Sequence, residues 1–154
     1  MIIQEFLKGI PLFRALDDDE LAQVLMVGLV KRYAQGASIL TEGAKGGQLH
    51  VILEGHVRIS KLVPGIGEEA LAILSPGDFF GEVEFFDGAA ASAHAIAHAD
   101  CEVLAIPYRE VQALMESRPA LAAKFLWAFS RTLANRLRDT NQKMVNLFAI
   151  AREF

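Results

Sequence analysis

Residues 79–95 read FFGEVEFFDGAAASAHA, a stretch that contains Gly81, Glu82 and Ser92 but no lysine or arginine. Glycine allows the backbone to approach a ligand closely. A glutamate can accept hydrogen bonds from a sugar hydroxyl, and a serine can donate one to a phosphate oxygen. We expect residues 85–90 to form one short helical turn, whose free N–H groups suit an anion. Because the same residue types are common in tight turns, the stretch predicts either a loop around a small polar ligand or an ordinary turn between strands.

The stretch lies in a zone, residues 28–106, in which glycines separate short runs of branched residues. Short strands at a spacing of roughly 8–12 residues, with turn residues between them, predict a β-barrel or sandwich. Alanines alternate with Ser92, His94 and His98, which predicts a strand with one small-residue face. On a strand, residues four apart are separated by about 13 Å. His94 and His98 are therefore not expected to share a metal ion, and we predict no metal site.

Helical patterns flank this zone on both sides. In residues 1–27, apolar residues recur at three- and four-residue spacing, and Asp17 is expected to cap a second helix. Residues 107–154 also have a helical pattern, in which Pro119 can start the last helix. We therefore expect a single domain over the whole chain, with helices at each end of the β-barrel.

The last helix carries a heptad seam. Its members follow alternating steps of four and three: Leu126, Ser130, Leu133, Leu137, Thr140, Met144, Leu147 and Ala151. One interpretation is a helix that lies on its own barrel. The other, which we prefer, is a homodimeric parallel coiled coil through residues 121–151, because a helix this long gains most from packing on a partner. Polar seam residues weaken a coiled coil but can set its register or contact something else.

The composition excludes several classes of protein. Hydrophobic residues make up 53% of the chain and charged residues 22%, which is typical of a globular protein rather than a disordered one. The formal net charge is -4 and the basic residues are scattered, so we expect no direct binding of nucleic acid. The single cysteine, Cys101, excludes an internal disulfide and is expected to be buried. We find no targeting or membrane-spanning segment and expect a cytoplasmic protein.

Enzyme signatures are also missing. The sequence contains no nucleophile elbow, P-loop or GxGxxG motif. Glu82 and Glu84 could form a hydrolase pair, but no second signature accompanies them. We therefore predict that the chain is not an enzyme.

Several stretches together resemble the cyclic-nucleotide-binding domains, most closely the catabolite activator (CRP/FNR) group. They are FLKGIPLFRALDDDEL (6–21), YAQGASILTEG (33–43), LHVILEGHVRISK (49–61), LSPGDFFGEVEFF (74–86), ASAHAIAHADCEVLAI (91–106) and NRLRDTNQKMVNL (135–147). The resemblance covers nearly the whole chain. It implies an antiparallel jelly-roll β-barrel with N-terminal helices and a long C-terminal dimerisation helix. It also implies a regulatory domain that senses a small ligand, with cAMP or cGMP as the candidates.

The resemblance assigns roles to particular residues. The ribose-binding glutamate of the family corresponds to Glu82, after Gly81, and the phosphate would meet Ser92 and the turn that begins at Val83. Two polar residues of the long helix that reach the purine correspond to Thr140 and Asn141.

A further residue of the long helix and two departures from the family pattern affect the expected ligand. Arg136, one turn before Thr140, could pair with Glu82 or lend its charge to a phosphate. The arginine that pairs with the cyclic phosphate is replaced by Ala91, and Glu84 replaces a small residue. Loss of the arginine should weaken phosphate binding by about 1.5–3 kcal/mol, or roughly ten- to a hundredfold.

These departures keep other interpretations open. The fold could act as an interaction or dimerisation module without a nucleotide, or it could sense a different small effector. A haem sensor would need an axial ligand from His50, His56, His94 or His98. The transcription regulators of the family continue past the long helix into a winged helix-turn-helix, and no such segment follows here, so we expect a sensor domain only.

Overall fold

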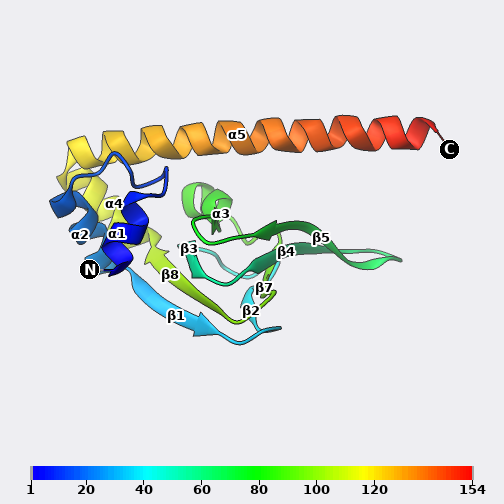
Figure 1. The fold of residues 1–154 in the computed structure, drawn as a ribbon, viewed down its shortest axis with the longest axis horizontal. Helices are drawn as coiled ribbons and strands as arrows, with labels where there is room; N and C mark the ends of the chain where they lie inside the picture. Colours follow the sequence, from blue (N-terminus) through cyan, green and yellow to red (C-terminus); the bar gives the residue numbers. More distant parts are fainter. Residues whose placement is uncertain (1, 154) are drawn as a thin grey trace.

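The computed structural model describes residues 2–153, except for the side chains of Ile2, Val83 and Glu84. The helices are α1 (Ile2–Lys8), α2 (Asp18–Val27), α3 (Glu82–Asp87), α4 (Tyr108–Ser117) and α5 (Pro119–Arg152). The strands are β1 (Leu29–Tyr33), β2 (Ser38–Leu40), β3 (Gln48–Glu54), β4 (Val57–Val63), β5 (Gly67–Leu74), β6 (Phe79–Phe80), β7 (His94–Ala97) and β8 (Cys101–Pro107). Figure 1 shows α1, α2 and α4 gathered at one end of the strands, α3 between the strands and α5, and α5 running along the whole molecule.

The strands form two antiparallel sheets of four strands each. One has the order β1-β8-β3-β6 and the other β2-β7-β4-β5. This arrangement confirms the predicted antiparallel jelly-roll type with flanking helices, although the strands form two sheets rather than one closed ring. The short helical turn expected at residues 85–90 begins earlier, since α3 spans Glu82–Asp87.

Two hydrophobic clusters hold the molecule together. The smaller cluster lies between the sheets and contains Ile52 and Val103 of the first sheet with Val57 and Ala95 of the second. The larger cluster joins the helices to the first sheet; among its members are Leu7, Phe13, Leu21, Leu49, Phe79, Phe85, Leu104, Val111, Phe125 and Phe129. Burial of this apolar surface is the main favourable term in folding. The helices are therefore part of the folded core and not an appendage.

Local sequence signals at the helix starts agree with the prediction. Asp17 caps α2: its Oδ1 accepts a hydrogen bond from the Glu20 backbone N–H at 2.8 Å, and Glu20 Oε1 accepts one from the Asp17 N–H at 2.9 Å. This reciprocal pair satisfies two backbone donors that a helix otherwise leaves open. The buried Glu20 carboxylate also forms an ion pair with Lys124, whose Nζ lies 2.7 Å from Glu20 Oε1, and this pair connects α2 to α5. Pro119 is the first residue of α5, as expected.

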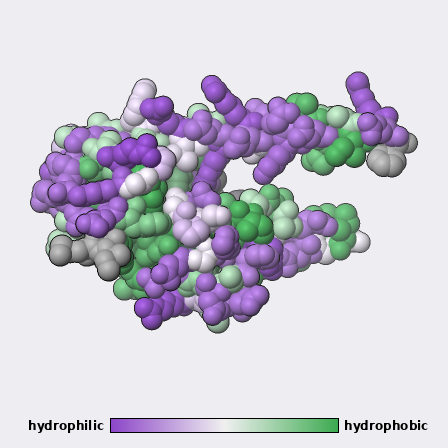
Figure 2. Space-filling model, in the orientation of Figure 1, coloured by the Kyte–Doolittle hydropathy of each residue, from purple (hydrophilic) through white to green (hydrophobic). Residues whose placement is uncertain are grey.

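The two halves of α5 have different surroundings. Leu121, Phe125 and Phe129 in the first half are buried against the core. Every residue from 137 to 153 is exposed in this single chain. Figure 2 shows apolar side chains on the C-terminal end of α5 and on the β4–β5 hairpin opposite it. They are Met144, Val145, Leu147, Phe148 and Ile150 on the helix and Leu62, Ile66, Leu71 and Ile73 on the hairpin.

Cys101 is buried at the start of β8, as the alternating pattern predicted. Burial raises the pKa of its thiol, with a smaller contribution from the charge of Asp100. A thiol with a raised pKa is a weak nucleophile at neutral pH. Across residues 2–153, the structure contains no helix that is both long enough and apolar enough to span a membrane.

Candidate functional site

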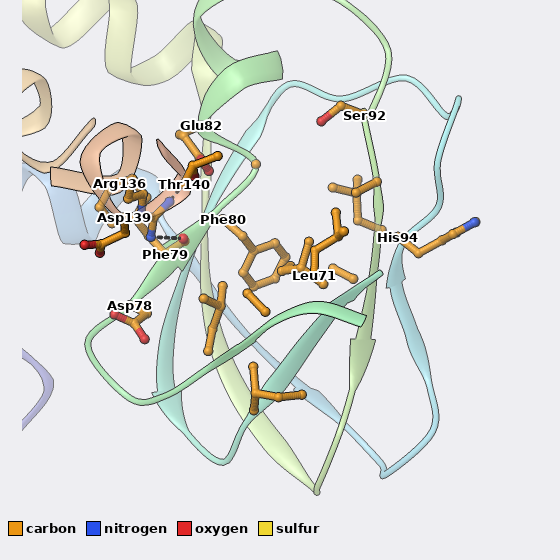
Figure 3. Close-up of a pocket in the computed structure, with 18 of the residues that line it drawn as sticks. Leu71, Asp78, Phe79, Phe80, Glu82, Ser92, His94, Arg136, Asp139 and Thr140 are labelled. Carbon is orange, nitrogen blue, oxygen red and sulfur yellow. Dashed lines mark hydrogen bonds and ion pairs between the residues drawn. The ribbon is translucent and has the colours of Figure 1, made fainter. Parts of the chain in front are cut away.

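A cavity of about 530 Å³ lies between the β-sheets, α3 and α5. Its lining comes from segments far apart in the sequence: Leu40, Ile59, Leu71, Ala72, Ile73, Leu74, Asp78, Phe79, Phe80, Gly81, Glu82, Ser92, Ala93, His94, Ala95, Arg136, Asp139, Thr140 and Lys143. In Figure 3, Glu82, Arg136 and Thr140 lie on one side of the cavity and Ser92 on the strand side. The structure thus brings Gly81, Glu82 and Ser92 of the opening stretch together with α5.

The turn from β6 into α3 requires glycine. Gly81 has φ +81°, a conformation that side chains rarely adopt, and an added Cβ would lie 2.7 Å from the Gln48 carbonyl oxygen. A side chain here would therefore strain the backbone and collide with β3. The tight turn positions the next residue, Glu82, at the start of α3 and at the edge of the cavity.

Glu82 forms an ion pair with Arg136 of α5. Arg136 Nη1 lies 2.9 Å from Glu82 Oε1, and Arg136 Nη2 donates a hydrogen bond to the Phe79 carbonyl oxygen at 2.5 Å. The guanidinium carbon also lies 4.0 Å from the centre of the Phe79 ring, a cation–π arrangement. Three contacts thus fix one arginine of α5 against β6 and α3. Of the two pairings that the sequence left open for Arg136, the one with Glu82 is present.

Ser92 and Ala91 face different surroundings. Ser92 is exposed and lines the cavity, where its hydroxyl can donate to a ligand. Ala91 is only 4% exposed and does not line it. The Ala91 N–H donates to the Ala44 carbonyl at 2.9 Å, and the Ala91 carbonyl accepts from the Gly43 N–H at 2.8 Å. The residue that replaces the family's arginine is thus part of the structural frame beside the cavity.

The α5 residues predicted to reach a base differ in position. Thr140 lines the cavity, whereas Asn141 is exposed and does not line it in this single chain. The side chains of Val83 and Glu84 lie outside the described residues, so their orientation toward the cavity stays a prediction.

Sequence reasoning missed several residues that line the cavity. Asp78 precedes β6, Asp139 and Lys143 lie on α5, and the side of β5 is formed by residues 71–74. Residues three and four apart share one face of a helix, so Arg136 could have indicated Asp139, Thr140 and, one turn further, Lys143. No comparable signal marks β5, because its place beside the cavity depends on the pairing of distant strands.

His94 and His98, which were not expected to share a metal ion, each have a different neighbour. His94 Nδ1 accepts a hydrogen bond from the Glu42 backbone N–H at 3.1 Å, and His98 Nδ1 lies 3.1 Å from Arg58 Nη1. No group of three or more histidine, cysteine, aspartate or glutamate side chains in the described part of the chain could hold a metal ion. β7 is a strand, as the alternation predicted.

Charge on the outer face of the same sheet is balanced locally. Arg58 Nε donates to Glu68 Oε1 at 2.7 Å, and this hydrogen bond lowers the pKa of the Glu68 carboxyl, with a smaller contribution from Ser60. Lys61 Nζ lies 3.6 Å from Glu42 Oε1. These pairs lie on β4, β5 and the loop after β2, and β4 pairs with the strand β7 that carries His94.

Comparison with known proteins identifies relatives of the whole chain. A sequence model of the cyclic nucleotide-binding domain matches residues 30–118. The cyclic AMP receptor protein of Thermus thermophilus is 33% identical over 138 residues, which cover 90% of this chain and 62% of that protein. The chain thus spans less than two thirds of this relative's length. These relatives are named for a cyclic AMP receptor and, in Mycobacterium tuberculosis, for a CRP-like cAMP-activated global transcriptional regulator. Neither name is that of an enzyme, which agrees with the prediction for this chain.

Solved structures have the same fold. The N-terminal domain of a transcriptional regulator from Streptomyces coelicolor A3(2) matches with a TM-score of 0.74 and 32% identity, over 90% of this chain and 94% of that one. A cyclic nucleotide-binding domain from Methylobacillus flagellatus matches with a TM-score of 0.83 and 25% identity, over 93% of this chain and 80% of that one. With the matched fold, the glycine turn and Glu82 at the cavity, the chain belongs to the cyclic nucleotide-binding domain family, in its CRP/FNR group.

Proposed function

We propose that this chain binds a small ligand of the cyclic-nucleotide class in the cavity between the sheets and α5, and that binding changes the position of α5. One observation carries the proposal: Glu82 and Ser92 from the β6–β7 segment and Arg136 and Thr140 from α5 line the same cavity. A ligand that contacts both sides has different affinities for different positions of α5. Such a difference is what allows a ligand to shift a conformational equilibrium.

The lining suggests how a cyclic nucleotide would lie. Glu82 would accept a hydrogen bond from the ribose hydroxyl, and Ser92 would donate one to the phosphate. Thr140 would meet the base. Because Arg136 already contacts Glu82 at 2.9 Å, the ribose hydroxyl would compete with Arg136 for the carboxylate. Ligand binding would thus weaken a contact that holds α5 to α3.

The charge of the cavity predicts weak binding. Ala91 replaces the arginine that pairs with the cyclic phosphate in the family. The Arg136 guanidinium is already held by Glu82 and by the Phe79 carbonyl. Lys143 is the other cationic side chain of the described lining, on α5 rather than beside Ser92. We therefore expect roughly ten- to hundredfold weaker binding than in a relative with the arginine, the loss expected for one charge-assisted hydrogen bond.

Dimerisation would complete the signalling element. The second half of α5 is exposed and apolar, and a helix gains most of its stability from packing of such a face. In a parallel dimer, Leu137 and Met144 would meet their copies in the seam. Asn141 lies about 100° further round the helix than Thr140, on the flank of the seam, where the partner chain would approach it.

Calorimetry with cAMP and with cGMP tests the proposal. We expect weak binding heat with the wild-type chain and a loss of that heat in Ser92→Ala, which removes the hydroxyl that would donate to the phosphate. Adenosine, which lacks the phosphate, serves as the matched ligand control. Absence of both heat and a melting-temperature shift at millimolar cAMP and cGMP would contradict nucleotide binding.

A second candidate function follows from Ala91 and from the Glu82–Arg136 pair. A cavity with its main cation already neutralised would suit an uncharged small effector, or none, in which case the fold acts as an interaction and dimerisation module. Glu82→Ala separates these functions. If cyclic nucleotides bind, this variant loses their ribose contact; if the pair is only structural, the variant changes stability and leaves signalling unchanged.

A further inference from the structure

A second groove lies between the first half of α5 and the loop between α1 and α2. Its volume is about 700 Å³, and it is lined by Pro11, Arg14, Ala15, Ala123, Lys124, Trp127, Ala128, Arg131, Thr132 and Asn135. Figure 1 shows this loop, in dark blue, crossing beside the yellow first half of α5. None of these lining residues takes part in the cavity at Glu82.

Trp127 is the apolar feature of this groove. Its neighbours Phe125 and Phe129 are buried in the core, whereas Trp127 is 69% exposed. The small side chains of Ala123 and Ala128 leave space beside the indole. Tryptophan and arginine are both enriched among the residues that contribute most to protein–protein binding. The groove therefore has an apolar anchor point that the single chain does not fill.

The charge of the groove is positive. None of its lining residues is acidic, although the chain as a whole has a net charge of -4. Lys124 is neutralised by Glu20 at 2.7 Å. Arg14 and Arg131 are exposed, and no described carboxylate lies within ion-pair distance of either. Two cationic side chains thus remain available to a partner from opposite walls of the groove.

The groove stays accessible in the dimer proposed above. With 3.6 residues per turn, Lys124 and Arg131 lie on the side of α5 away from the heptad seam that contains Leu133 and Leu137. Trp127 lies between the two sides. A coiled coil through the seam would therefore leave the arginine side of the groove open.

We propose that this groove docks an acidic peptide segment of a partner protein. An apolar side chain of the peptide packs against Trp127, and its carboxylates pair with Arg14 and Arg131. Charge complementarity argues for this occupant, because the lining presents Arg14 and Arg131 and contains no acidic residue. The proposal is independent of what binds in the cavity at Glu82.

Trp127 is the only tryptophan of the chain, so intrinsic fluorescence reports on this groove directly. The probe is a short synthetic peptide of glutamates around a central Leu-Phe pair, titrated into the full chain. We expect a blue shift of the emission as the indole leaves water. Added salt should weaken binding, because exposed charges are screened beyond about 8 Å at physiological ionic strength.

Two variants sharpen the test. Arg131→Glu should weaken peptide binding by about tenfold or more, since it replaces attraction with repulsion. Arg109→Glu makes the same charge change on α4 outside the groove and should leave binding nearly unchanged. Circular dichroism checks that both variants are folded. A peptide in which lysines replace the glutamates should not bind.

Other results would overturn the proposal. One is an emission that no acidic peptide shifts at millimolar concentration. Another is equal weakening by Arg131→Glu and Arg109→Glu, which would mean that net charge alone attracts the peptide. A shift that depends on protein concentration, together with dimer formation in sedimentation, would assign the groove to a second copy. Tighter binding of a single-stranded oligonucleotide would assign it to nucleic acid.

Discussion

The first and second halves of α5 both carry large apolar side chains, but their surroundings are opposite. In the first half, Leu121, Phe125 and Phe129 complete the core of their own chain. In the second half, Leu137, Met144, Leu147 and Phe148 face solvent. The helix is continuous from Pro119 to Arg152, so the difference does not come from a break in its backbone. The first half is packed against its own chain, whereas the second half leaves its apolar side chains exposed, which is the observation behind the proposed dimer.

The difference distinguishes the α5 residues that hold the fold together from those that we propose to act in assembly. Removal of a buried side chain from the first half should lower the stability of the fold, whereas a change in the second half should alter assembly and leave the fold intact. Arg136 lies at the boundary between the halves, where its contacts with Glu82 and Phe79 hold α5 to the cavity.

The largest effect is expected at Phe129. Its ring packs on Phe86, Phe79 and Phe125, with centroid distances of 4.6, 5.0 and 5.9 Å. Phe129→Ala should lower the free energy of unfolding by about 3–5 kcal/mol, the usual range for removing a buried aromatic ring. Urea unfolding measures it. Phe148→Ala, in the exposed half, is the control, and similar losses in both variants at monomer concentration would contradict the division.

Assembly should respond next. The double variant Leu137→Glu with Met144→Glu places two charges in the seam, where each lost apolar side chain is worth about 1.5–3 kcal/mol of burial. Sedimentation should show a monomer at concentrations where the wild type is a dimer, and circular dichroism should show a shorter helix. Asn146→Glu, on the opposite side of the helix, should leave the dimer in place. A wild-type chain that is monomeric at every concentration would contradict the proposal that the second half of α5 packs against a second copy.

The boundary contact is worth less. Arg136→Gln breaks an ion pair whose side chains are 30% and 17% exposed, so the free energy of unfolding should fall by about 1 kcal/mol. Hydrogen exchange should rise in α3 and in the middle of α5. The control is Arg32→Gln, because the Arg32 side chain of the pair with Glu102 is 85% exposed and should contribute almost nothing. Equal losses of stability in the two variants would mean that Arg136 does not hold α5 to β6 and α3.

The smallest effect on stability is expected at Asp17, which caps α2. This helix is linked to the first half of α5 by the ion pair between Glu20 and Lys124. The backbone N–H of Glu20 lowers the pKa of the Asp17 carboxyl below its ordinary value of 3.8. A carboxyl whose pKa is lowered on folding stabilises the folded state at pH values above its ordinary pKa. This stabilisation is lost as the pH falls through the lowered pKa of the folded state. Asp17→Asn should melt earlier than wild type at pH 7, with a smaller difference at acid pH. A difference that does not change with pH would contradict this assignment.

Signals that act over a few residues were predictable. The Asp17 cap, Pro119 at the start of α5 and the strand at His94 all follow from local backbone chemistry. The family resemblance added the positions of Glu82 and Thr140, both of which line the cavity.

Contacts between distant segments were harder to predict. The sequence allowed two partners for Arg136, and only the fold selects Glu82 and the Phe79 carbonyl, because the crossing of α5 over β6 depends on tertiary packing. The groove at Trp127 had no signal at all. It exists because the loop with Pro11 and Arg14 lies beside α5, more than a hundred residues away in the chain.

The length of α5 has a mechanical consequence. Its 34 residues extend about 50 Å at 1.5 Å per residue. From Arg136 to Arg152 the helix projects about 24 Å beyond its last firm attachment. If release of Arg136 tilts this segment by about 10°, the far end moves by roughly 4 Å. In the proposed dimer, the rearrangement of one hydrogen-bonded side chain would thus become a displacement large enough to change the packing of the two α5 helices.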